Sequence, residues 1–145
     1  MNETYNYFYP IFAMVFLTFI VAVKMFADRM REMKIKKFRL RTFATSKARE
    51  ELEHVQAADN FKNLFEFPVL FYALAILLIH MNNYRPMYLT LMWAFVVARY
   101  VHSLIHCSYN KVLHRFYAFV TSFFILVFMW AIFFFEILVT GNRHV

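Results

Sequence analysis

Four long apolar runs restrict the fold of this chain more than any other feature. They lie at 10–27, 64–81, 87–107 and 116–140, and each is near the length of about 20 residues with which a helix crosses a bilayer. Spanning segments must satisfy their backbone hydrogen bonds internally, which favours helices. Since 62% of the residues are hydrophobic and Gly occurs once, we expect an all-α, transmembrane four-helix bundle. One domain, 1–145, would hold spans at 10–27, 61–81, 87–107 and 116–140.

The segment after the first run is strongly basic. Residues 24–49 hold ten Lys or Arg against two acidic residues. The positive-inside rule therefore places the loop at 28–50 in the cytoplasm and both termini outside; in a bacterium the membrane would be the inner one. Cations beside a span contact anionic membrane lipid. Without a recognition module they do not indicate nucleic-acid binding.

Two prolines are expected to shape the first two helices. Pro10 suits the first position of the opening helix, where its missing N–H costs nothing. Pro68 lies inside the second apolar run, where it would free the carbonyl of Leu64 and bend the helix. Such a bend either opens room for a ligand or only kinks a packed helix.

Polar residues recur inside the second and third runs. Arg99, His102 and His106 are spaced to share one face of a helix, and ionisable groups within a membrane predict a functional site. On the preceding helix, steps of three connect Asn60, Asn63 and Glu66. Glu66 and Arg99 would lie at a similar depth. An ion pair between them would belong to the site or would only fix the packing of the helices.

Arg115 is expected in the first turn of the fourth helix. Unpaired N–H groups and the helix dipole favour an anion there. A thiol bound beside this cation would have its pKa lowered and become a nucleophile. The alternative is that Arg115 only contributes to membrane topology.

A metal site is the other chemistry that the histidines suggest. His102 and His106 have the spacing at which two imidazoles on one helix can share an ion, and Glu66 could add a carboxylate. Six histidines are too few for the paired boxes of membrane oxygenases, and His80 is on the wrong side to ligate a haem with His102. We therefore predict no metal.

The motif NFKNLFEFP at 60–68, with Arg99-x-x-His102 and Arg115, resembles the MAPEG family (membrane-associated proteins in eicosanoid and glutathione metabolism), most closely its bacterial members. The resemblance implies a homotrimer that binds glutathione between protomers near the cytoplasmic side. Arg115 would match the arginine that stabilises the glutathione thiolate. The implied cofactor-binding residues are Asn60, Asn63, Glu66, Arg99, His102 and His106.

Two positions depart from the family pattern. An arginine usually lies shortly before the asparagine and a glutamate follows it by three residues, whereas here Gln56-Ala57-Ala58-Asp59 precedes Asn60 and Asn63 takes the glutamate position. We expect a glutathione-dependent transferase, peroxidase or isomerase acting on a lipophilic small molecule. The alternatives are a non-catalytic protein of the same fold that binds lipid or another anionic amphiphile, and a structural membrane subunit.

Overall fold

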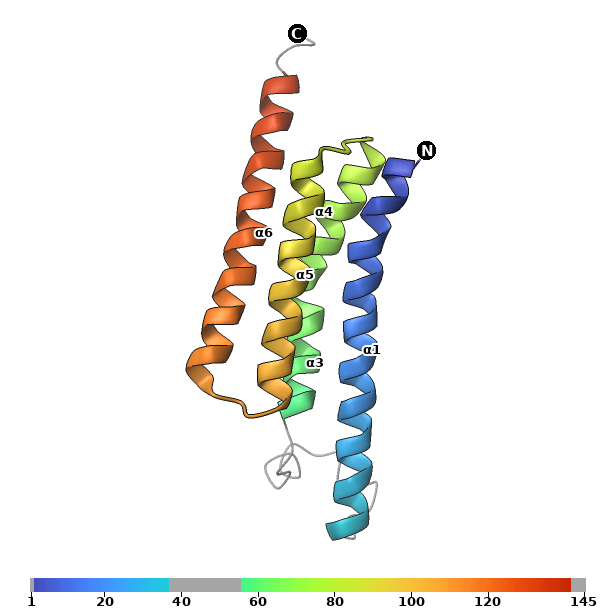
Figure 1. Cartoon of the computed structure of the whole chain (residues 1–145), viewed down its shortest axis with the longest axis vertical. Coiled ribbons are helices and arrows are strands. Elements are labelled where there is room, and N and C mark those ends of the chain that lie inside the picture. The colour runs from blue at the N-terminus through green and yellow to red at the C-terminus, as the bar shows by residue number, and fades with distance from the viewer. Residues whose placement is uncertain (1, 37–55, 142–145) are drawn as a thin grey trace.

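The computed structural model describes residues 2–36 and 56–141, and these form a bundle of long helices (Figure 1). The helices are α1 Asn2–Lys36, α3 Gln56–Glu66, α4 Pro68–His80, α5 Pro86–Cys107 and α6 Val112–Gly141. α3 and α4 follow one another along a single interrupted rod and together form one span. The described residues therefore contain four segments that are long and apolar enough to cross a membrane. The all-α, four-span prediction is confirmed.

α5 is the central helix of the bundle. It packs against α1, α3 and α6, while α6 packs mainly on α5. The start of α1 and the end of α6 lie at one end of the bundle, here called the termini end, and the α5–α6 connection lies at the opposite loop end (Figure 1). The core includes Phe71 and Phe95, whose rings stack at 4.7 Å. Many Phe side chains are instead exposed on the outer surface, as expected of residues that face lipid.

The first helix differs from its predicted limits. α1 begins at Asn2, so the prediction that Pro10 starts the helix is wrong; Pro10 lies inside it. A proline removes a single backbone donor, and spanning helices tolerate this loss. α1 also continues to Lys36. The first part of the predicted basic loop is therefore helical, and residues 37–55 of that loop lie outside the described residues.

Pro68 interrupts the second span, as predicted. α3 ends at Glu66 and α4 begins at Pro68, because a proline cannot donate the hydrogen bond that would join the two helices. Phe67 lies at the break. Its ring packs against Phe119 and Phe123 of α6, with centroid separations of 5.9 and 5.3 Å. The break thus lies beside the half of α6 that is nearer the loop end.

Candidate functional site

The polar face of α5 is buried in the bundle. Arg99 is 0% exposed, and His102 and His106 are each 2% exposed. The apolar residues of α5 that are exposed, such as Val97 and Leu104, lie on other faces of the helix. Charged and imidazole groups are therefore turned away from lipid, and the face that Arg99, His102 and His106 share, here called the polar stripe, points into the bundle.

Asn60 joins α3 to α5. Its amide Nδ2 donates to Cys107 Sγ at 3.4 Å, and its Oδ1 accepts from Ser103 Oγ at 3.4 Å. The side chain is completely buried. One helical turn further along α3, the carbonyl of Asn63 accepts from Arg99 Nη2 at 3.2 Å. Asn60 and Asn63 thus lie beside the polar stripe, Asn60 through its side chain and Asn63 through its backbone.

Glu66 lies away from this cluster. It is exposed, and the suggested ion pair with Arg99 is not formed; Arg99 instead contacts the Asn63 carbonyl and lies 5.9 Å from the ring centroid of Phe119. The reason is helical phase, since six residues turn the chain by about 600° and leave Glu66 about 120° away from Asn60. The cation–π contact with Phe119 only partly replaces a carboxylate.

Arg115 lies in the first turn of α6 and meets α5 at two points. Its Nη1 donates to His106 Nε2 at 3.3 Å, and its backbone carbonyl lies 3.1 Å from His102 Nδ1. Nη1 also donates to Asn110 Oδ1 at 3.0 Å. The side chain is half-buried. The structure therefore brings Arg99, His102, His106 and Arg115 together at the loop end of the bundle.

Asn110 is a site residue that the sequence reasoning missed. Its φ of 48° is in the left-handed region, which Asn tolerates better than most residues. Its N–H donates to the carbonyl of Ile105 at 2.9 Å and so closes the end of α5. The sequence signal for this turn was an Asn within the short polar stretch between two apolar runs, because Asn favours turns.

Positive charge gathers where α6 begins. Lys111 precedes the helix, and Arg115 lies in its first turn. Cations are unfavourable at this end of a helix, because the dipole and the unpaired N–H groups already make it electropositive. Anions are bound readily at such an end. The start of α6 is therefore suited to a negatively charged ligand.

Buried polar atoms without partners are confined to the same cluster. Among the described residues, the buried side-chain atoms that lack a hydrogen-bond partner are Arg99 Nε and Nη1, His102 Nε2 and His106 Nδ1. Native interiors pair nearly all such groups. The cluster is thus the part of the described protein whose hydrogen bonding is incomplete. No group of three His, Cys, Asp or Glu that could hold a metal occurs in residues 2–36 and 56–141.

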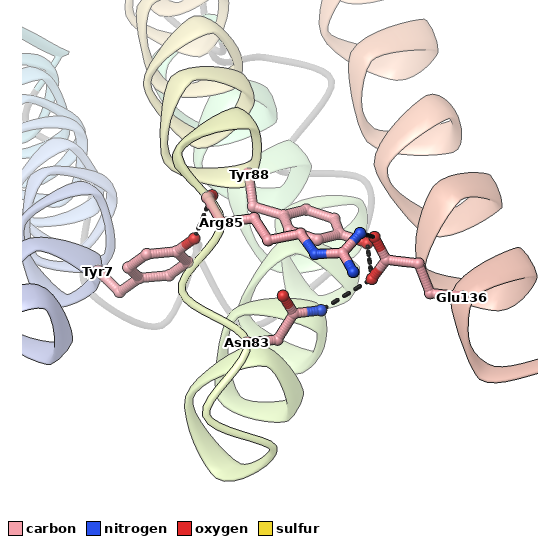
Figure 2. Close-up of polar contacts among 5 residues, drawn as sticks. All are labelled: Tyr7, Asn83, Arg85, Tyr88 and Glu136. Atoms are coloured by element: carbon pink, nitrogen blue, oxygen red, sulfur yellow. Dashed lines mark hydrogen bonds and ion pairs between the residues drawn. The ribbon is translucent and has the colours of Figure 1, made fainter. Parts of the chain in front are cut away.

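A second polar cluster lies at the termini end (Figure 2). Glu136 of α6 pairs with Arg85 and accepts hydrogen bonds from Asn83 Nδ2 at 2.8 Å and from Tyr88 Oη at 3.0 Å. Tyr7 of α1 donates to the Arg85 carbonyl at 2.7 Å. These contacts join α1, the α4–α5 connection and α6. Because the main polar groups of this cluster are paired with one another, the cluster stabilises the packing of the helices and requires no ligand to complete its hydrogen bonds.

Apolar hollows lie along the sides of the bundle. A hollow of about 600 Å³ runs between α1 and the α3–α4 rod, and its lining includes Val15, Phe65 and Tyr72. Another of about 320 Å³, between α1 and α5, is bordered by Lys24 and Cys107. Both have the apolar lining that suits an acyl chain or a lipophilic molecule.

Comparison with protein-family models matches residues 7–135 to the MAPEG family. The matched segment includes Arg99, His102, His106 and Arg115, the polar cluster at the loop end. No individual curated protein and no solved structure gives a match.

Proposed function

The chain belongs to the MAPEG family and is an integral membrane protein; from this premise we propose that it is a glutathione-dependent transferase, peroxidase or isomerase. Members of the family use glutathione as substrate or cofactor. The second substrate is a lipophilic molecule that reaches the protein through the bilayer. The proposed assembly is a homotrimer with glutathione between adjacent protomers.

The observation that carries this proposal is the incomplete hydrogen bonding around Arg99. A buried guanidinium without a carboxylate is costly unless something pairs with it. Glutathione carries two carboxylates and a thiol that can ionise, so it would supply the missing negative charge. The electropositive start of α6 lies beside the same cluster.

In the proposed reaction Arg115 is the catalytic residue. Its guanidinium faces the sulfur of glutathione and stabilises the thiolate after the S–H proton leaves to water. In the transferase case the thiolate attacks an electrophilic carbon and forms the C–S bond as the leaving group departs. The stabilisation is electrostatic, and the low-polarity surroundings strengthen it.

Arg99, Asn60 and Asn63 bind the peptide in this proposal. Arg99 supplies its unpaired Nε and Nη1, and Asn60 and Asn63 form the adjoining wall on α3. His102 and His106 lie beside Arg99 and contact Arg115. Glu66, exposed on α3, contributes only where the outer face of α3 meets a neighbouring protomer. The loop end faces the cytosol, from which glutathione enters.

A conjugation assay with glutathione and an electrophilic aromatic compound tests the proposal on purified protein. Arg115→Ala should lower kcat/KM by at least about 100-fold, in line with the loss of one strong electrostatic contact in an active site. Lys111→Ala is the matched control, because it removes an exposed cation next to the same helix turn and should stay within about threefold. Equal loss in both variants would contradict a specific role for Arg115.

The 600 Å³ apolar hollow favours a second candidate, a non-catalytic protein of the same fold that binds an anionic amphiphile. The acyl chain would occupy a hollow, and the headgroup would pair with the cations at the loop end. This candidate predicts no thiol turnover together with lipid binding that weakens in Arg115→Ala. The same preparations decide between the two functions.

A further inference from the structure

We infer that His102 and His106 are positioning residues that hold Arg115 from two directions, and that each does so as the neutral imidazole protonated on Nδ1. The inference deepens the proposed function and rests on its assignment of Arg115. It differs from a direct ligand-binding role for the two rings, since both act on the ligand through Arg115.

The contact between His106 and Arg115 fixes the first tautomer. Arg115 Nη1 lies 3.3 Å from His106 Nε2, and a guanidinium has only donors. His106 Nε2 must therefore carry a lone pair. In a neutral ring the proton is then on Nδ1. A protonated imidazolium would place a second N–H and a like charge against Arg115.

The contact between His102 and Arg115 fixes the second tautomer. His102 Nδ1 lies 3.1 Å from the backbone carbonyl of Arg115, which can only accept. His102 Nδ1 must therefore carry a proton. Nε2 is then a buried acceptor, and it is one of the atoms without a partner among the described residues.

Together these contacts fix both the backbone and the side chain of Arg115. Its Nη1 has two N–H groups, and they are directed to His106 Nε2 and Asn110 Oδ1. Among the described residues, Arg115 Nε and Nη2 make no hydrogen bond, so one edge of the guanidinium is anchored and the opposite edge is available. A guanidinium held in this way can make two hydrogen bonds to an anion through its available edge.

Crossed amide substitutions test the assignment. The amide group of Gln lies near the place of Nε2 in His, and that of Asn lies near the place of Nδ1. His106→Gln can still accept from Arg115 and His102→Asn can still donate to its carbonyl, so both should keep kcat/KM within about threefold. His106→Asn and His102→Gln put the amide at the wrong distance and should lose about tenfold or more, mainly in kcat.

All four variants exchange an imidazole for an amide, so a general effect of lost packing would not produce the crossed pattern. The melting temperature of each variant shows whether it folds. If Gln and Asn perform alike at both positions while the protein stays folded, the two histidines do not position Arg115 through these atoms.

A spectroscopic measurement decides the inference without turnover. In wild-type protein labelled with ¹⁵N-histidine, both rings should show a protonated Nδ1 and an unprotonated Nε2 at neutral pH, with each ring assigned by its own substitution. A proton on His106 Nε2 would overturn the inference. If the tautomers are as expected but no variant and no wild-type protein conjugates thiols, the positioning contacts stand and the proposed enzymatic function fails.

Discussion

Arg99 Nη2 donates to the backbone carbonyl of Asn63 at 3.2 Å. Among the described residues this carbonyl is the hydrogen-bond acceptor of the buried guanidinium, and Arg99 Nε and Nη1 have no partner. A full positive charge is thus held inside an apolar bundle by one neutral acceptor and the face of Phe119. Such an arrangement lowers the stability of the ligand-free protein. A negatively charged ligand that pairs with Arg99 would offset this cost.

Replacing Arg99 should therefore separate stability from binding. We expect Arg99→Met to raise the free energy of unfolding of the ligand-free protein by about 1–3 kcal/mol, because an apolar side chain of similar length removes an uncompensated buried charge. Glutathione should raise the melting temperature of the wild-type protein, and the same variant should lose this rise. Thermal unfolding in detergent, with and without glutathione, measures both effects. A less stable Arg99→Met protein with unchanged glutathione response would mean that Arg99 is purely structural.

The cluster around Glu136 should matter for stability and not for the loop-end chemistry. Glu136→Ala removes the acceptor of Arg85, Asn83 and Tyr88 and should cost about 1–3 kcal/mol, as expected when hydrogen bonds to a charged group are lost. Glu66→Ala is the matched control, since Glu66 is an exposed carboxylate and should change stability by less than about 0.5 kcal/mol.

Two measurements check this contrast: the melting temperature, and the glutathione affinity at a temperature where each variant is folded. A stable Glu136→Ala protein would show that the helices do not depend on the termini-end contacts. A large loss of glutathione affinity in folded Glu136→Ala would contradict the separation of the two clusters.

The orientation in the membrane that the basic residues predict can be tested by labelling. In a Cys107→Ser background, Asn82→Cys at the termini end and Lys111→Cys at the loop end both place a thiol at an exposed position. We expect a membrane-impermeant maleimide to label Asn82→Cys in intact cells and Lys111→Cys only after permeabilisation. The reverse pattern would place the proposed thiol site outside the cytosol.

The fold could be predicted from the sequence because its strongest signals are local. Long apolar runs define the spans, Pro68 marks the break between α3 and α4, and the spacing of Arg99, His102 and His106 predicts a shared face, which the structure buries. The start of α1 could not be located in the same way. Pro10 is compatible with both the first turn and the interior of a spanning helix, and only the tertiary context decides.

The contacts of the site depend on pairing between helices, which spacing within one helix does not determine. Glu66 follows Asn60 and Asn63 in steps of three, yet two such steps rotate it out of the cluster. The involvement of Asn110 depends on a left-handed turn residue beside Arg115. The Glu136 cluster unites residues more than fifty positions apart in sequence, and no motif connects them.

The most direct test of the role of Arg115 is the ultraviolet absorbance of a thiolate when glutathione is added to the purified protein at neutral pH. We expect a saturable increase for wild type, its loss in Arg115→Ala, and no increase with S-methylglutathione, which has no thiol proton to lose. An absence of thiolate in wild-type protein that binds glutathione, or an equal signal in Arg115→Ala, would contradict the claim that Arg115 stabilises the ionised sulfur.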